Sequence, residues 1–400
     1  MSDRPVTILC LASYYKGARF LEAAHALGCR VILVTREKLH NEPWPWDSID
    51  RVFYMPRLST QPDITYAVSY LARQEFIDRI VPLDDYDVLT AAALREHLRL
   101  PGLGQSTARL YRDKLAMRVR AQQAGIAVPP FSPIFHHHSL YEFTQRVPGP
   151  WVLKPRMEAG AMGIKQVHHE PEIWPLLEQL GDEQSAFLLE KFVPGRVYHV
   201  DGLVWDGEVI LEVPSKYARP PMRVAHEGGV FVTYTLSPED EEAQEILQLN
   251  QELMAVLGMD YGAYHSEFIR GDDGTLYFLE TAARVGGASI DVLVEAASGL
   301  NPWAEWAAIE AALTHGETYE LPKPKADFAG LLVCLARQQW PDLSGYRDPE
   351  IYYYMRKENH AGLILSAADF DRVQQLLGEY TGRFAHDFLA VAPPLDKAPE

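Results

Sequence analysis

The sequence predicts an α/β protein that opens with a doubly wound parallel sheet and continues into a larger α+β region. The opening residues alternate apolar strand-like runs with helical spacing, which is typical of βαβ units. From residue 151 onward, strands and hairpins alternate with helices. With 400 residues, 47% hydrophobic and 23% charged, the chain has the composition of a globular protein but is too long for one core. We therefore expect several packed units.

The first unit begins with a short βαβ pattern. Residues 6–12 (VTILCLA) form an apolar run of the kind found in buried parallel strands. Residues 17–27 follow with helical spacing, and Gly28 is placed to end that helix. Residues 30–35 (RVILVT) are the second strand. This short crossover predicts a right-handed, doubly wound sheet.

The rest of the first unit repeats the alternation. We expect strands at 52–55 and 79–83 and helices at 64–76 and 88–97. Residues 13–19 (SYYKGAR) lack GxGxxG and Walker spacing, so we interpret them as a plain strand-to-helix loop.

A Pro- and Gly-rich stretch, residues 101–106 (PGLGQS), marks a boundary after the first unit. A helix is expected over 107–124, before the loop at 125–133.

Composition excludes several classes of function. The net charge of −18 argues against a partner that is a nucleic acid or an acidic membrane, because both need a basic surface. The chain has no apolar run long enough for a membrane span and no signal-peptide pattern. Its three cysteines are far apart and lack metal-ligand spacing. We expect a cytoplasmic protein.

The clearest chemical signal is a predicted β-hairpin of residues 264–270 (YHSEFIR) and 275–281 (TLYFLET). If Asp273-Gly274 forms a two-residue turn, counting outward places Glu267 directly opposite Glu280. Directly opposed residues share a face, with Cβ atoms about 4.5–5.5 Å apart.

That shared face should be half buried, because we expect Ile269, Leu276 and Phe278 on it as well. Two carboxylates there repel each other unless a cation or a shared proton intervenes. A hard divalent ion such as Mg²⁺, bridging both carboxylates and the phosphates of a nucleotide, is the natural answer. The alternative is a register that differs by one, in which the glutamates lie apart on solvent faces.

Two further patterns suit an anionic substrate near these carboxylates. Arg284, four residues past Glu280, can meet a phosphoryl group or a carboxylate, and Gly286-Gly287 permit close backbone approach. Lys154 lies on a short strand that a loop of small residues follows, and such a loop can fold over phosphates.

Two more patterns have weaker signals. Residues 187–195 (FLLEKFVPG) leave a strand in a way that can offer an N–H and a C=O to an adenine edge, although a plain strand-to-loop exit fits equally well. Lys114 opens a helix, and a solvated surface lysine is its default interpretation.

Taken in order, these motifs resemble the ATP-grasp superfamily of carboxylate–amine ligases. The resemblance covers roughly residues 100–315, and its specificity comes from the order of six motifs: RDK at 112–114, GIAVP at 125–129, VLKP at 152–155, LLEKFVPG at 188–195, HSEF at 265–268 and LYFLETAARVGG at 276–287. The Glu-x-x-Ala-Arg run followed by Gly-Gly is similar to the branch that contains L-amino acid ligases and carnosine synthase.

The resemblance implies an ATP-grasp fold with four parts. These are an N-terminal doubly wound, Rossmann-like domain (1–105), a small lobe (106–190) that carries a phosphate lid (156–163), a large lobe with the metal site (191–315), and a small C-terminal α+β unit (316–400).

The resemblance also implies ATP and Mg²⁺ as cofactors, with Mn²⁺ able to substitute, small-molecule carboxylate and amine substrates, and a homodimer. It implies these residue roles: ATP binding by Lys114, Lys154, the lid residues Glu158, Ala159, Gly160 and Gly163, and the hinge residues Glu190, Lys191, Phe192 and Val193; metal binding by Glu267 and Glu280; catalysis by Arg284 and Lys154; and substrate binding by His226, Arg284, Gly286 and Gly287.

Three positions depart from the family pattern. Ala282 stands where an Asn often provides a further metal ligand, and Ala161 stands in the lid where Ser is frequent. Val197 stands where an acidic residue usually binds ribose, so we expect His199 or Asp201 to bind the ribose instead. For His226, a surface histidine is the default alternative to the substrate role.

Rival functions make different predictions. A bicarbonate-activating enzyme of the biotin carboxylase or carbamoyl-phosphate synthase type would need a biotinyl partner or its equivalent, and the chain has no Met-Lys-Met biotinylation site. An ATP-binding regulator would have lost the charged site residues, which are all present. A metallohydrolase that uses residues 136–138 or 168–169 fails on spacing, because adjacent histidines on a strand point to opposite faces.

Overall fold

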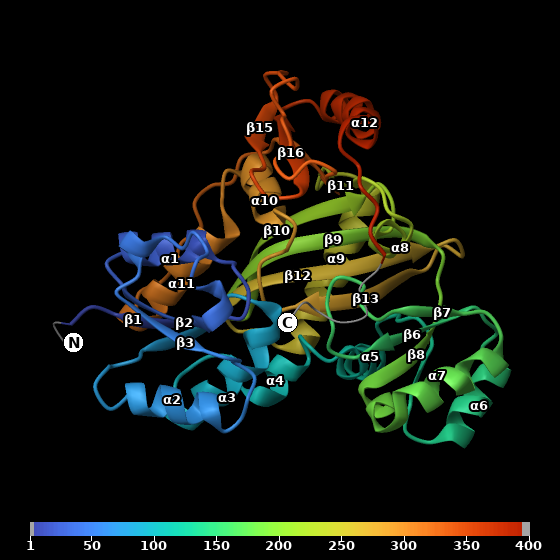
Figure 1. Ribbon diagram of the computed structural model, residues 1–400, viewed down its shortest axis with the longest axis horizontal. Coiled ribbons are helices and arrows are strands. Elements are labelled where there is room, and N and C mark those ends of the chain that lie inside the picture. The colour runs from blue at the N-terminus through green and yellow to red at the C-terminus, as the bar shows by residue number, and fades with distance from the viewer. Residues whose placement is uncertain (1–3, 394–400) are drawn as a thin grey trace.

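The computed structural model describes residues 4–393, which form three sheets (Figure 1). Each sheet, together with the helices packed on it, is called a body below, and the body that contains the first sheet is the N-terminal body. The N-terminal sheet is parallel throughout, with strand order β3-β2-β1-β4. Its strands are β1 (Thr7–Ala12), β2 (Arg30–Arg36), β3 (Arg51–Met55) and β4 (Arg79–Pro82). The predicted doubly wound sheet is confirmed.

Helices cover both faces of this sheet. The apolar side chains of α1 (Ala18–Ala26) and α11 (Pro302–His315) pack on one face, and those of α2 (Asp63–Leu71) and α3 (Val88–Leu98) pack on the other. Helix α2 ends five residues before the predicted limit at 76. Three-residue 3₁₀ turns occur at Glu37–Leu39, Trp46–Ser48 and Asp85–Asp87.

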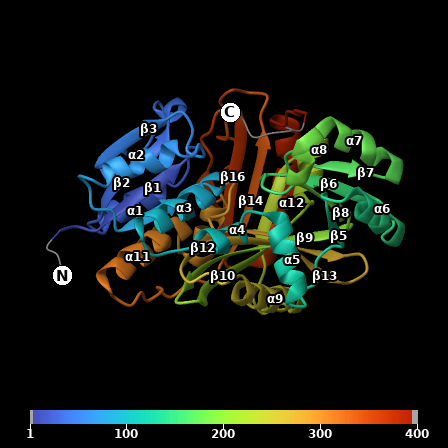
Figure 2. The same ribbon diagram turned by 90° about the horizontal axis from the view of Figure 1, so that it is seen from below.

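The helix predicted over 107–124 is in fact two helices, α4 (Gln105–Arg109) and α5 (Lys114–Gln123). Asp113 breaks the run because its carboxylate accepts hydrogen bonds from the Leu115 and Ala116 N–H groups and so caps α5. The break places Lys114 in the first turn of α5. Seen from below, α5 lies between the N-terminal body and the second sheet (Figure 2).

The second sheet has the order β5-β8-β6-β7 and is antiparallel. It contains β5 (Phe131–Pro133), β6 (Trp151–Pro155), β7 (Lys165–Val167) and β8 (Phe187–Lys191). Helices α6 (His137–Arg146) and α7 (Ile173–Leu180) pack on it through a small apolar core, and 3₁₀ turns occur at Glu170–Glu172 and Gly181–Ala186.

The third sheet has eight strands in the order β13-β12-β9-β10-β11-β14-β16-β15. These strands are β9 (Gly195–Trp205), β10 (Glu208–Tyr217), β11 (Phe231–Thr235), β12 (Gly262–Gly271), β13 (Leu276–Ala282), β14 (Phe328–Leu335), β15 (Ile351–Tyr354) and β16 (His360–Ala367). The accompanying helices are α8 (Pro221–Glu227), α9 (Glu241–Leu257), α10 (Ile290–Ser298) and α12 (Phe370–Asp387).

The C-terminal α+β segment does not form a sheet of its own, because β14 pairs with β11 of the preceding segment. The predicted limits of the four domains stay predictions. Within residues 4–393, no helix is long and apolar enough to cross a membrane.

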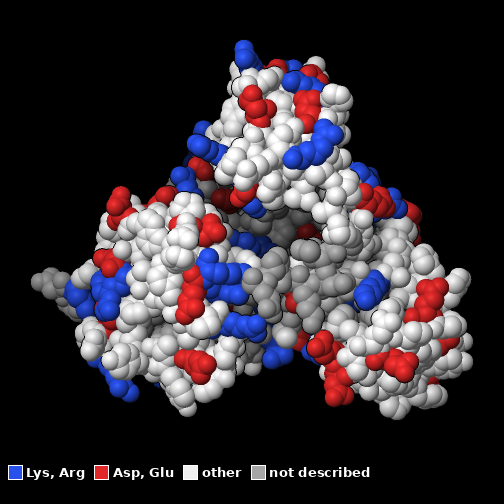
Figure 3. Space-filling view, viewed as in Figure 1, with Lys and Arg blue, Asp and Glu red and all other residues white. Residues whose placement is uncertain are grey.

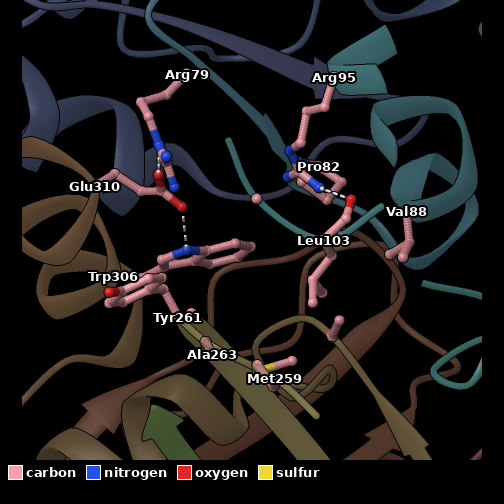
Figure 4. A pocket seen from close by; sticks show the side chains of 13 residues that line it. Arg79, Pro82, Val88, Arg95, Leu103, Met259, Tyr261, Ala263, Trp306 and Glu310 are labelled. Atoms are coloured by element: carbon pink, nitrogen blue, oxygen red, sulfur yellow. Dashed lines mark hydrogen bonds and ion pairs between the residues drawn. The ribbon is translucent and has the colours of Figure 1, made fainter. Parts of the chain in front are cut away.

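A buried polar junction fixes the N-terminal body to the rest of the chain (Figure 4). Glu310 on α11 accepts hydrogen bonds from Arg79 on β4 and from the Trp306 indole. Arg95 on α3 donates to the carbonyls of Ile80 and Leu103 and so ties the following loop to the sheet. Buried partners of this kind fix α11, which follows the third sheet's β13 in the sequence, against the first sheet. Figure 3 shows a hollow between the three bodies, with Lys or Arg and also Asp or Glu side chains around it.

Candidate active site

The hairpin of β12 and β13 places Glu267 directly opposite Glu280, as predicted. The path to this pairing differs from the expectation. The turn is one residue longer, so Arg270 pairs with Leu276, and a bulge after Glu267 restores the register.

The bulge changes the neighbours of the two glutamates. Ile269 packs with Tyr277 and Leu279, whereas Leu276 and Phe278 belong to the core on the other face of the sheet. The expectation that Leu276 and Phe278 share the face of the glutamates is therefore wrong, because the bulge breaks the alternation of side chains along β13 between Phe278 and Glu280.

Glu280 forms an ion pair with Lys114, whose Nζ lies 2.9 Å from its Oε2. Burial alone would raise the pKa of Glu280, but Lys114 and then Lys154 outweigh it and lower that pKa to about 2. Lys114 also donates to the main-chain carbonyl of Glu158 at 2.6 Å. The predicted alternative for Lys114, a solvated surface lysine, is wrong, since this residue is 8% exposed.

Glu267 has different partners. Tyr217 donates its hydroxyl to Glu267 Oε1 at 2.7 Å, and His265 Nε2 lies 3.5 Å from the same oxygen. Among the described residues, no group bonds Glu267 Oε2 or Glu280 Oε1. Each carboxylate thus keeps one oxygen for a ligand, and this donor set of paired carboxylates fits Mg²⁺, which keeps several waters of its own.

Lys154 and Glu190 lie together in a buried charge network. Glu190 Oε1 accepts from Lys154 Nζ, and its Oε2 accepts from Arg118 Nε, both at 2.5 Å. Burial lowers the pKa of Lys154 to about 8 although Glu190 opposes the shift. The Glu190 side chain therefore holds two cations in place beside the predicted phosphate site.

The hinge main chain is partly occupied by the protein itself. The Lys191 N–H donates to Pro130 O, and the Phe192 N–H donates to Pro150 O. Within the described part of the chain, the Val193 N–H has no hydrogen-bond partner. Of the predicted hinge donors, Val193 is thus the one that can meet an adenine edge.

The loop after β6 lies against α5. Lys114 N donates to Arg156 O at 2.8 Å, and Glu158 and Ala159 line the same pocket as Lys114, Glu280 and Arg284. Gly160 and Gly163 both adopt φ of 67°, the left-handed region that glycine tolerates. Ala161 adopts φ of 60° and is strained there, which marks the loop as a constrained segment.

Arg284 meets a residue that the sequence interpretation missed. Its Nε lies 3.9 Å from Asp85 Oδ1, and neither buried atom has a hydrogen-bond partner. Arg112 donates to the other oxygen of Asp85 at 2.6 Å. Asp85 follows β4, at the carboxyl edge of the parallel sheet where ligands of such sheets bind, and that rule was the available signal for it.

Arg118 was missed as well, although its position four residues after Lys114 puts both side chains on one face of α5. His226 lies at the end of α8, and the described contacts join it to no other candidate residue. Its substrate role stays a prediction.

The predicted ribose roles of His199 and Asp201 are wrong. His199 is fully buried, with Nδ1 at 2.6 Å from Asp201 Oδ2 and Nε2 at 2.7 Å from Thr233 Oγ1. Asp201 also bonds His265 Nδ1 at 2.9 Å. In the register of β9 and β12, His199 lies directly opposite Glu267 and not at the hinge. The network of His199, Asp201 and His265 therefore packs beside Glu267 and holds that part of the sheet in place.

The Gly286-Gly287 pair allows a sharp stability test. A Cβ on Gly286 would lie 2.5 Å from Asp201 Oδ1, whereas a Cβ on Gly287 meets nothing within 4 Å. We expect Gly286→Ala to cost about 1–3 kcal/mol in the free energy of unfolding, because Asp201 must shift away from its histidines. Urea unfolding of this variant beside Gly287→Ala checks the expectation. Equal stability of the two variants would contradict the close approach at Gly286.

Two sheets that face each other across paired carboxylates, two buried lysines and a strained loop define a two-lobed site for an anionic ligand such as a nucleotide phosphate. Comparison with known families agrees. Residues 21–102 match an ATP-grasp N-terminal domain, and residues 147–291 match an ATP-grasp domain. The chain belongs to the ATP-grasp superfamily.

Individual relatives point the same way. An L-arginine-specific L-amino acid ligase of Bacillus subtilis is 28% identical over 233 residues, 56% of each chain. A D-alanine–D-alanine ligase of Neisseria gonorrhoeae is 23% identical over 45% of this chain and 59% of its own. The chain therefore spans somewhat more than half the length of these curated relatives. The solved L-amino acid ligase of Bacillus licheniformis has the same fold, with a TM-score of 0.77 over 98% of this chain and 99% of its own, at 18% identity.

Proposed function

We propose that this protein is an ATP-dependent ligase that joins a carboxylate to an amine through an acyl phosphate. The observation that carries the proposal is the pairing of Glu267 with Glu280 beside Lys114, in a pocket that Arg284 also lines. The names of the relatives, an L-amino acid ligase and a D-alanine–D-alanine ligase, support this activity.

The reaction divides into two steps. The substrate carboxylate attacks the γ-phosphorus of ATP, which releases ADP and leaves an acyl phosphate. The amine then attacks the acyl carbon, the C–O bond to phosphate breaks, and an amide, inorganic phosphate and a proton result. Mg²⁺ bound by Glu267 and Glu280 would neutralise phosphate charge.

The side chains of the protein supply the remaining stabilisation. Lys114 and Lys154 lie where they can meet phosphate oxygens, and Arg284 can hold the reacting carboxylate. In the substrate-free arrangement, Glu280 neutralises the charge of Lys114 and Glu190 neutralises the charge of Lys154. Neither buried lysine is therefore left without a counter-charge before ATP binds.

The carboxylate substrate is proposed to be an amino acid. Asp85 Oδ1 and Arg284 Nε are buried, lie 3.9 Å apart and have no hydrogen-bond partner. An α-amino acid carries an ammonium and a carboxylate on one carbon, so it can satisfy both orphan atoms at once. A plain carboxylate would leave Asp85 Oδ1 without a hydrogen-bond partner, although Asp85 Oδ2 still accepts from Arg112.

ADP release measured with a panel of amino acids, singly and in pairs, tests the proposal. We expect release to depend on Mg²⁺ and an amino acid, and amide product to form when an amine partner is added. Release with bicarbonate and biotin, and none with amino acids, would favour the carboxylase alternative.

Asp85→Asn tests the role of Asp85. It keeps the size of the side chain but removes the charge that would meet the ammonium. We expect the KM for the amino acid to rise about 10- to 100-fold, since a hydrogen bond to a charged group contributes about 1.5–3 kcal/mol. The KM for ATP should stay near that of the wild type, and the exposed Asp47→Asn should change neither constant. Parallel rises in both KM values would argue against a direct role in amino-acid binding.

Several finer predictions accompany the proposal. Mg²⁺ is the proposed metal, with Mn²⁺ as a substitute, and the small lobe, lid and hinge residues are proposed to bind ATP. A homodimer and a cytoplasmic location stay predictions.

A further inference from the structure

The loop after β6 is bound to the N-terminal body by a hydrogen bond between two side chains. Tyr86, in the turn between β4 and α3, donates its hydroxyl to Glu158 Oε2 at 2.8 Å. These residues are 72 positions apart in the sequence and belong to different bodies. The contact therefore joins the N-terminal sheet directly to the predicted phosphate lid, residues 156–163.

The ring of Tyr86 is held in place from two sides. The Arg112 guanidinium lies over it, 5.0 Å from the ring centroid, and the Tyr14 ring packs at 5.5 Å. Arg112 also donates to Asp85 and to the Met157 carbonyl. Tyr86 directly follows Asp85 in the sequence. Arg112 contacts both of these residues and the main chain of the lid.

We infer that Tyr86 is a positioning residue that couples occupancy of the Asp85 site to closure of the lid, and so protects the acyl phosphate from water. The inference rests on the proposed function and extends it to the N-terminal body. An ammonium bound at Asp85 would hold the turn Asp85–Asp87 in one conformation. The hydrogen bond from the Tyr86 hydroxyl would then hold Glu158, and with it the lid, in place. A lid that is held down excludes water from the pocket.

Loss of the contact has a defined chemical consequence. Water, instead of the amine, attacks the acyl phosphate, and the products are the free carboxylate and inorganic phosphate. ATP is then hydrolysed to ADP without amide formation. The ratio of ADP to amide therefore measures how much of the acyl phosphate reacts with water.

Tyr86→Phe is the direct test, because it removes only the hydroxyl that bonds the lid. With saturating ATP, amino acid and amine, we expect the ratio of ADP to amide to rise about three- to tenfold, which corresponds to the loss of one part-buried hydrogen bond of ordinary strength. Glu158→Ala breaks the same bond from the other side, and adding it to Tyr86→Phe should raise the ratio little further. Tyr66→Phe on α2, where the side chain is 69% exposed, is the matched control and should leave the ratio unchanged.

Amide hydrogen exchange tests the contact between Tyr86 and Glu158 independently of the reaction. In the ligand-free protein, we expect residues 157–163 to exchange about three to ten times faster in Tyr86→Phe than in the wild type, with no change in Tyr66→Phe. Unchanged exchange in Tyr86→Phe would overturn the inference even if the ligase activity is established. Faster exchange in a protein that forms no ADP with any amino acid would refute the proposed function and the coupling role that rests on it, while confirming the contact itself. Faster exchange with an unchanged ratio of ADP to amide would refute the coupling role alone.

Discussion

Glu280→Gln is expected to abolish ADP formation, with a loss of at least about 10³-fold in turnover. Glutamine keeps the shape of the side chain but removes the charge that pairs with Lys114 and that would bind the metal. One carboxylate, Glu267, would then remain opposite a neutral amide. Mg²⁺ prefers charged oxygen ligands, so it should no longer be held between the two strands.

The comparison for this variant is Glu239→Gln, which changes an exposed glutamate and should keep wild-type turnover. Unfolding in urea, measured on both variants, separates loss of the site from loss of the fold. Full turnover in Glu280→Gln would refute the metal assignment.

Glu190→Leu is expected to cause the largest loss of stability. Glu190 accepts from Lys154 and Arg118, and all three side chains are buried. Removing the carboxylate leaves two buried cations without a counter-charge, which costs about 3–5 kcal/mol. Lys154 would partly escape this cost by losing its proton, because burial already lowers its pKa to about 8.

Urea unfolding near neutral pH and again near pH 9 measures both parts of this expectation. The deficit should shrink at the higher pH, since the cost of a protonated Lys154 is present below its pKa and disappears above it. The exposed Glu178→Gln in the same lobe should be neutral at both pH values. A deficit below about 1 kcal/mol would show that the network contributes little to folding.

Local sequence patterns were sufficient to predict the strands and loops that contain the site residues. The strand-like runs around Glu267 and Glu280, the small-residue loop after Lys154 and the βαβ start each have a period or a turn signal within a few residues. The hairpin pairing was right although the assumed turn was one residue too short, because a bulge after Glu267 compensates. A bulge has no reliable sequence signature, so the predicted face for Leu276 and Phe278 was wrong.

Long-range contacts were beyond this kind of prediction. Asp85 reaches Arg284 across 199 positions only because β4 of the first sheet meets the end of β13. The bond between Tyr86 and Glu158 likewise depends on how two bodies pack. His199 was assigned to ribose by its distance from the hinge along the chain, whereas the strand register turns it toward Glu267. The helix over 107–124 was drawn as continuous because the capping of α5 by Asp113 was not weighed.

A crystal structure with Mg²⁺ and a non-hydrolysable ATP analogue tests the central claim most directly. The account predicts a metal ion about 2.0–2.1 Å from one oxygen of Glu267 and one of Glu280, with the phosphates reaching toward Lys114 and Lys154. A metal bound elsewhere, or phosphates directed away from both lysines, would contradict it.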